Sequence, residues 1–197
     1  MSKNYIIILT TLFTILNGCA TSEMPNEYKR VNNKIIDLNG YWEYIGNYNE
    51  KKEQIASAIK ISSGVVYRAI KTTGVFNGKS EEKVRKNSRG VAHLFFEDSK
   101  NIQITQTNYS LFVNFDRSIV EEYSFGELKK IQLGNVFAMR SSGWVGNSYI
   151  IETLDSYGMK ITEKYRLTLN SNLERVIIFR DNKMNETKIM QLYHKTK

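Results

Sequence analysis

Residues 159–169, MKITEKYRLTL, decide the fold class because apolar and polar side chains alternate along the whole stretch. Met159, Ile161 and the later apolar residues fall on one side of an extended chain, while Lys160, Thr162 and the later polar residues fall on the other. This period of two is typical of a β-strand with one face on a core and the other in water.

Shorter stretches of the same kind surround it between residues 101 and 194. Strands are expected at 102–107, 109–115, 119–125, 136–144, 148–154, 173–180 and 187–194. Residues that favour turns separate them: Asp116-Arg117, Gly146-Asn147, Asp155 to Gly158, Asn170 to Asn172, and Asp181-Asn182. Spacings of about ten residues leave no room for crossover helices, so neighbouring strands are expected to pair as antiparallel hairpins.

The region before this meander has a different character. Leu38–Gly46, LNGYWEYIG, predicts one more strand, bounded by glycines. From Tyr48 to about Asp98, apolar residues instead recur at helical spacing, with glycines that divide the region into two expected helices. Because an open sheet would expose two edges, we expect a mainly β (α+β) fold: an antiparallel meander closed into a barrel or curled into a half-barrel, with a helical insert over about 48–98.

Short motifs in the meander resemble known families. Gly40-Tyr41-Trp42 resembles the G-x-W signature of the lipocalins, although a helical insert follows where a typical lipocalin has its second strand. Residues 101–193 are similar to envelope proteins of unknown function with a lipocalin-like meander. The matching phrases are Ile104-Thr105-Gln106, Gly143-Trp144-Val145-Gly146, Ile151-Glu152-Thr153 and Glu163-Lys164-Tyr165. The resemblance implies a lipocalin-like barrel or half-barrel.

The first residues resemble the leader of a bacterial lipoprotein. Lys3 supplies a positive charge, and Tyr5–Leu16 is an uncharged apolar run of about 12 residues, shorter than the roughly 20 that a membrane-spanning helix needs. Leu16-Asn17-Gly18-Cys19 then resembles the lipobox. The resemblance implies cleavage after Gly18, diacylglycerol on the Cys19 thiol and acylation of the new amino terminus.

Lipid on Cys19 sets the expected organisation, since two or more acyl chains hold a protein stably on a bilayer. We expect a signal peptide over 1–18, a lipidated N-terminus and polar tether over 19–36, and a single β-meander domain over 37–197. By resemblance to enterobacterial sorting, Ala20 after Cys19 implies the outer membrane, facing the periplasm. The alternatives are a secreted protein without lipid and a core helix of a cytosolic protein.

Composition narrows the partners. The chain carries 28 lysines and arginines against 20 aspartates and glutamates, and a basic chain suits nucleic acid or an anionic membrane. Export makes nucleic acid the poorer candidate, so we expect none. The one cysteine allows neither an intramolecular disulfide nor a zinc site with several thiolates.

The candidate chemistry is sparse. No phosphate-binding, serine-hydrolase or zinc-protease motif is present. His93, in VAHLFF, suits a packed helix face better than a metal site, and His194 lies near the end of the chain. Glu163 and Arg175 share the phase of the buried faces. If residues 170–172 close the hairpin directly, however, these two charges lie on the order of 13 Å apart and do not touch.

Two aromatic positions and one basic stretch complete the list. Each tryptophan follows a glycine; Trp42 is expected to plug one end of the barrel, and Trp144 could do the same or stack on a ligand. Lys79–Arg89, KSEEKVRKNSR, is expected to form a solvated helix face, with anionic head groups as the alternative contact.

Two functions remain open at this point. The first is an envelope lipoprotein that binds a lipid or apolar small molecule in its curled sheet. The second is a non-enzymatic interaction or scaffold protein with a filled interior that docks an envelope partner. We expect no enzyme, no cofactor, no metal and no catalytic residue, and Cys19 as the site of lipid attachment.

Replacing Cys19 by serine removes the thiol that forms the thioether, so the precursor is expected to stay unlipidated. Metabolic labelling with palmitate checks this, with the unsubstituted chain as the control. Label in the Cys19→Ser protein equal to that in the control would refute the lipobox.

Overall fold

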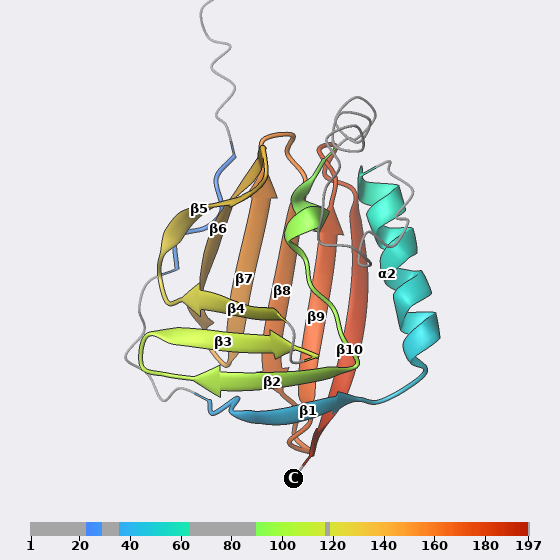
Figure 1. Ribbon diagram of the computed structural model, residues 1–197, viewed down its shortest axis with the longest axis vertical. Helices are drawn as coiled ribbons and strands as arrows, with labels where there is room; N and C mark the ends of the chain where they lie inside the picture. The colour runs from blue at the N-terminus through green and yellow to red at the C-terminus, as the bar shows by residue number, and fades with distance from the viewer. Residues whose placement is uncertain (1–22, 29–35, 64–89, 117–118, 197) are drawn as a thin grey trace, which may run out of the picture.

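The computed structural model describes residues 23–28, 36–63, 90–116 and 119–196. Ten strands form one antiparallel sheet in the order β4-β3-β2-β1-β10-β9-β8-β7-β6-β5 (Figure 1). The strands are β1 Gly40–Tyr44, β2 Asn101–Gln106, β3 Ser110–Phe115, β4 Ile119–Ser124, β5 Leu128–Leu133, β6 Val136–Val145, β7 Ser148–Asp155, β8 Lys160–Leu167, β9 Leu173–Arg180 and β10 Glu186–Thr196.

The strand order is a ring with one opening. β1 pairs with both β2 and β10, which joins the first strand to the last, and the opening lies between β4 and β5. Polar contacts bridge this opening: the Gly126 amide donates to the Ser142 carbonyl (2.8 Å), and Arg140 pairs with Glu121 (2.8 Å). The predicted mainly β half-barrel with a helical insert after its first strand is therefore confirmed.

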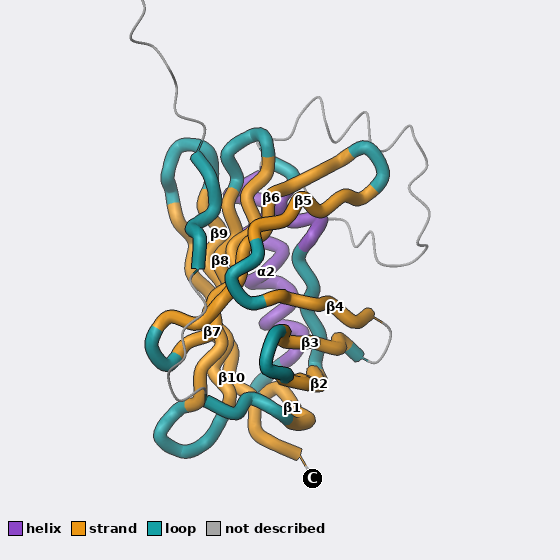
Figure 2. Tube along the Cα trace, turned by 90° about the vertical axis from the view of Figure 1, so that its left-hand side faces the viewer, coloured by secondary structure: helices purple, strands orange, loops and turns teal. Residues whose placement is uncertain are grey.

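The sheet folds back on itself, so that β1–β4 run across β7–β10 (Figure 1), and the side view places them on the same side of the long strands as the helix (Figure 2). One core fills the angle between these layers. It is mostly aromatic and β-branched, with Trp42, Ile104, Val113, Tyr149 and Tyr165 at its centre. Burial of such large side chains supplies most of the stabilisation of this half of the domain.

Helix α2, Tyr48–Ser63, covers the other half of the concave face. Asn47 caps it, because its side-chain oxygen accepts the Asn49 amide at 3.0 Å and its amide group donates to Glu50 at 3.0 Å. Buried Ile55 and Ile59 lie on one helix face and pack on β8, β9 and β10 in a second core.

The helical insert is only partly described. A short 3₁₀ helix, η2 (Ala92–Phe95), takes the place of the end of the second expected helix and packs on β7 and β8. The rest of that helix, the basic stretch Lys79–Arg89, the leader and Cys19 lie outside the described residues. Within the described part of the chain, no helix is long and apolar enough to cross a membrane.

One strand was missed and one register was wrong. β5 was not predicted because its sequence, LKKIQL, lacks clear alternation of apolar and polar residues; in the structure, half of its residues are exposed. The β8–β9 register also differs: Thr168 faces Asn172, with the Thr168 amide donating to the Asn172 carbonyl at 2.8 Å, and Leu167 pairs with Leu173. The loop is therefore 169–171, with Ser171 in the left-handed region (φ 59°), and Arg175 lies opposite Tyr165 instead of Leu167.

His93 provides a pH test of this packing. The side chain is 3 % exposed, as expected for a packed face, and burial lowers its pKa to about 4 from the usual 6.5. The unfolded chain therefore binds a proton near pH 6.5 that the folded chain takes up only near pH 4. The free energy of unfolding should fall as pH falls through this window, by on the order of 2–3 kcal/mol.

Urea unfolding between pH 7 and pH 4 checks this, with His93→Gln as the non-titrating comparison. The wild type should lose more stability than the variant as the pH falls. Parallel losses in the two proteins would contradict the assignment to His93.

Candidate functional site

The concave interior, where a lipocalin-like ligand was expected, is filled by side chains. Trp42, Tyr149, Tyr165, Tyr193 and Phe179 line it, and none is more than 2 % exposed. The hydroxyl groups are satisfied within the protein; the Tyr149 hydroxyl, for example, contacts the Tyr123 carbonyl and the Ser142 hydroxyl, each at 2.9 Å. A core packed in this way holds aromatic side chains where a ligand would otherwise lie.

Arg175 occupies the middle of this interior. Its guanidinium is fully buried and donates to the Glu163 carboxylate from Nε (3.0 Å) and Nη2 (2.5 Å), and to the Glu97 carbonyl (2.6 Å). Phe96 and Phe115 lie 5.0 and 5.3 Å from it, so aromatic rings cover the group. The expectation that Glu163 and Arg175 do not touch was wrong, because the changed register brings them into diagonal contact across β8 and β9.

Lys51 of α2 extends the charge cluster. Its ammonium donates to the Ser99 carbonyl at 2.7 Å and pairs with Asp98 at 3.2 Å, and Asp98 also lies 3.4 Å from Arg175. Burial lowers the pKa of Lys51 to about 8, against the opposing effect of Asp98. Lys51 and Arg175 therefore share one carboxylate, which ties the helix and the Glu97–Ser99 segment to the sheet.

Both tryptophans lie in the first core. The Trp42 indole donates to the Leu38 carbonyl at 3.1 Å, in agreement with the expected structural role. Trp144 is 6 % exposed and packs edge-on against Tyr149, with ring centroids 5.3 Å apart. The structure thus places Trp144 with the structural alternative.

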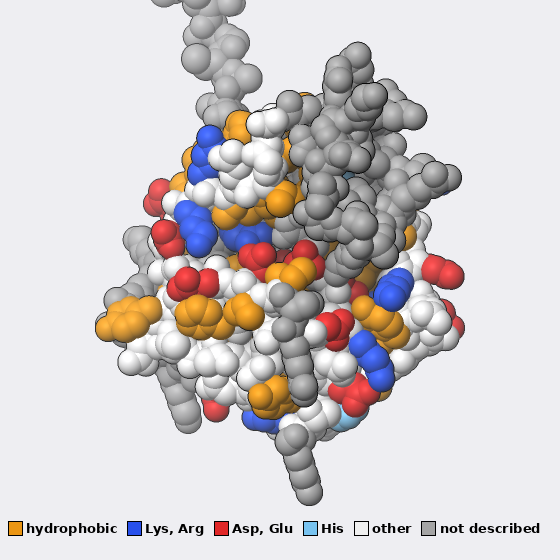
Figure 3. All heavy atoms as spheres, in the orientation of Figure 1, with side chains coloured by type: hydrophobic (Ala, Val, Ile, Leu, Met, Phe, Trp, Pro, Cys, Tyr) orange, Lys and Arg blue, Asp and Glu red, His pale blue; other side chains and the backbone are white. Residues whose placement is uncertain are grey.

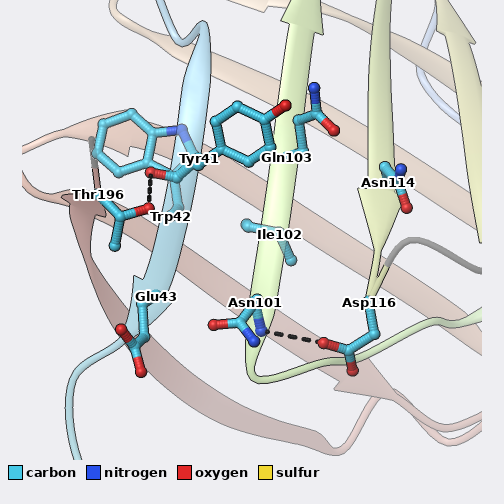
Figure 4. A pocket seen from close by; sticks show the side chains of 9 residues that line it. All are labelled: Tyr41, Trp42, Glu43, Asn101, Ile102, Gln103, Asn114, Asp116 and Thr196. Carbon is cyan, nitrogen blue, oxygen red and sulfur yellow. Dashed lines mark hydrogen bonds between the residues drawn. The ribbon is translucent and has the colours of Figure 1, made fainter.

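An open hollow of about 360 Å³ lies on β1–β3 (Figure 4). Tyr41, 47 % exposed, and the polar Gln103, Asn114 and Asp116 line it. The Asp116 carboxylate accepts the Asn101 amide at 3.4 Å, which holds one wall.

Residues Glu23–Tyr28, which we call the strap, lie against the convex face of the sheet. Asn26 donates from its backbone and side-chain amides to the Glu152 carboxylate, at 2.8 and 3.1 Å. Arg180 binds the Glu23 carboxylate. At Gly143 a Cβ would lie 2.5 Å from the Tyr28 Cβ, so only glycine lets the strap come this close. Part of the segment predicted as a tether is therefore docked on the domain.

The strap borders a second open hollow, of about 510 Å³, over β7–β10. Lys160 lines it and lies 2.9 Å from Glu152 and 3.9 Å from Glu23 of the strap. Burial, with the nearby Glu152 carboxylate, raises the pKa of Tyr28 above its usual range. The ion pairs of Lys160 and Arg180 with Glu152 and Glu23 suit a structural contact between strap and sheet.

Metal chemistry finds no support in the described ranges. No group of three or more histidine, cysteine, aspartate or glutamate side chains within them could hold an ion. His93 is a buried residue of η2, and His194 lies 3.7 Å from Glu43 at the surface, so the structure does not bring the two histidines together.

No model of a protein family matches the chain, and no curated protein matches it. A solved structure titled as a "secretary abundant heat soluble (SAHS) protein from Ramazzottius varieornatus" is similar, with 12 % identity and a TM-score of 0.45 over 81 % of this chain and 95 % of that chain. No residue or role is carried over from it.

Two parts of these sites were missed by sequence reasoning. Lys51 has a signal, because it falls four residues before Ile55 and eight before Ile59 on the buried helix face. The contact of Asn26 with Glu152 leaves no signal in the sequence, since 126 residues separate the two residues. Residues on both faces of β7 are buried, so the position of Glu152 in that strand does not point to Asn26.

The buried pair should be costly to break. Arg175→Met leaves the Glu163 carboxylate without its guanidinium and should lower the free energy of unfolding by about 3–5 kcal/mol, while Arg175→Met with Glu163→Leu should recover most of the loss. The comparison on the same strands is Arg166→Met, which breaks the Arg166–Glu174 pair (2.6 Å); because the Arg166 side chain is 55 % exposed, although Glu174 is buried, this change should cost less than Arg175→Met. Urea unfolding measures all three; equal costs for the two single variants would contradict the assignment.

Proposed function

We propose that this chain is a bacterial envelope lipoprotein, anchored through lipid on Cys19, that acts without catalysis through the outer surface of a lipocalin-like half-barrel. In this proposal the interior is structural and the protein binds an envelope partner. The periplasmic side of the outer membrane is the proposed location, which rests on Ala20 following Cys19.

The observation that carries the proposal is the burial of Arg175 at the centre of the concave face. An apolar ligand there would have to displace the aromatic rings that pack on the Arg175 guanidinium and separate the Glu163 carboxylate from Arg175. Leaving a buried charge unpaired costs several kcal/mol, which the binding free energy of a small ligand does not readily offset. This favours the filled-interior hypothesis over the ligand carrier.

The surface proposed for the partner is the hollow on β1–β3. Tyr41 offers an exposed ring, and Gln103 and Asn114 offer amide groups, which together suit the polar and aromatic character of a non-obligate protein interface. The hollow lies near the C-terminal end of β10, since Thr196 lines it and donates its hydroxyl hydrogen to the Tyr41 carbonyl at 3.3 Å (Figure 4).

Native mass spectrometry of the gently extracted protein tests the choice between the two hypotheses. We expect the mass of the lipidated chain alone, with no saturable one-to-one adduct on addition of palmitate or lysophosphatidylethanolamine. A typical lipocalin carried through the same extraction is the positive control. A stoichiometric adduct that survives dilution would overturn the filled-interior proposal and restore the carrier.

A further inference from the structure

Three exposed apolar side chains gather at one end of the sheet, next to the place where the strap begins. Met24, Tyr157 and Met184 are 51, 42 and 63 % exposed. Tyr157 lies in the β7–β8 turn and Met184 in the β9–β10 turn, both at the upper end of the sheet in Figure 1. Together with the exposed Lys183, we call these residues the apical surface.

The parts of this surface are neighbours. A Cβ on Gly158 of the first turn would lie 3.3 Å from the Cβ of Asn182 in the second, so the two turns are in contact. Met24 follows Glu23 directly, and the Glu23 carboxylate binds Arg180 at the end of β9, immediately before the second turn. Hydrophobic and basic side chains also lie side by side at the upper ends of β5–β7 (Figure 3).

The two turns are held firmly. The Asp155 carboxylate accepts the amides of Tyr157 (2.8 Å) and Met159 (3.0 Å), and it also binds the backbone of Val91 and Ala92 under the turn. In the second turn, the Asp181 carboxylate accepts the amides of Lys183 (2.8 Å) and Asn185 (2.9 Å). The apolar side chains are thus presented on fixed backbone and do not collapse onto the sheet.

The backbone of Met184 is unusual. Its φ of 69° lies in the left-handed region, which glycine and asparagine adopt at little cost and methionine does not. This conformation closes the β9–β10 hairpin, since the Met184 amide donates to the Asp181 carbonyl at 3.1 Å, as in three-residue hairpin loops that end in a left-handed residue. The side chain itself is 63 % exposed and is available for a contact outside the chain.

The position of the proposed lipid anchor indicates that this contact is with the membrane. Four residue steps separate Cys19 from Glu23, and a chain spans at most about 3.6 Å per residue, so the docked strap begins within roughly 14 Å of the lipid-bearing residue. The head-group region of a bilayer is itself several ångströms deep on each side. A lipid-anchored chain with its strap docked must therefore hold this end of the sheet at the membrane.

We infer that the apical surface, Met24, Tyr157, Lys183 and Met184, docks on the lipid bilayer and fixes the orientation of the domain. Tyrosine suits the membrane interface, methionine the acyl region below it, and lysine the anionic head groups. The inference rests on the proposed lipid anchor. It sets the long strands upright on the membrane and directs β1 and the hollow on β1–β3 away from it.

Depth-dependent fluorescence quenching tests this on the full lipidated protein. Asn182→Cys carries an environment-sensitive thiol label in the apical turn and leaves all four apical residues in place. The matched control is Leu169→Cys, at a fully exposed apolar residue in the β8–β9 turn at the opposite end of the sheet. The Cys19 thiol is consumed by lipidation, so the label reacts only with the introduced cysteine.

The proteins are reconstituted into vesicles of phosphatidylethanolamine and phosphatidylglycerol that contain a spin-labelled lipid as quencher. The quenching of the label at residue 182 should be at least roughly two-fold greater than that of the label at residue 169, because inserted groups reach about 5–10 Å into the interface. Equal quenching at the two ends, on protein that floats with the vesicles, would overturn the docking and leave the anchor intact.

Mass spectrometry of the same samples separates the two failures. A chain without acyl groups that stays in solution would overturn the lipid anchor, and the docking inference with it. A second apical variant, Tyr157→Ser with Met184→Ser in the labelled Asn182→Cys protein, should lower the quenching at residue 182, although the anchor and the strap keep it above the level at residue 169. Unchanged quenching in that variant would assign the approach to the anchor alone and refute a role for the apolar side chains.

Discussion

The burial of one guanidinium, that of Arg175, is the constraint on which the rest of the structure depends. A charge without exposed surface is tolerated only where its donors are satisfied. Glu163 supplies a carboxylate from the neighbouring strand, and the Glu97–Ser99 segment must cross the sheet at this point to supply a carbonyl group and Asp98. Lys51 then pairs with Asp98 and holds the helix in place. Sheet, crossing segment and helix are therefore locked by one network.

The ring-like strand order follows from the same need to keep water out. Pairing of β1 with β10 brings β1–β4 across the long strands and covers the part of the concave face that the helix leaves open. The ring stays open between β4 and β5, where Arg140 and Glu121 bridge the gap with side chains in place of ladder hydrogen bonds. A half-barrel closed in this way has an interior filled by buried side chains.

A filled interior moves function to the outside of the molecule. The convex face carries the strap, and the contact of Asn26 with Glu152 shortens the path between the proposed anchor and the domain. The two ends of the sheet differ in chemistry: the exposed Tyr157 and Met184 lie in turns at the end where the strap begins, and amide and carboxylate groups line the hollow on β1–β3. In the proposed arrangement, one end meets lipid and the other meets a partner.

The sequence alone predicted the strands other than β5, because alternation is a local property of each stretch: 159–169 predicts β8, and Glu163 and Arg175 were correctly placed on the inner face. It also contains the leader and Cys19, whose lipidation stays a prediction. Only the tertiary structure decided the register, since moving the loop to 169–171 preserves the faces while bringing Glu163 to Arg175. It alone placed Lys51 and the strap, because their partners lie dozens of residues away and no local pattern encodes such contacts.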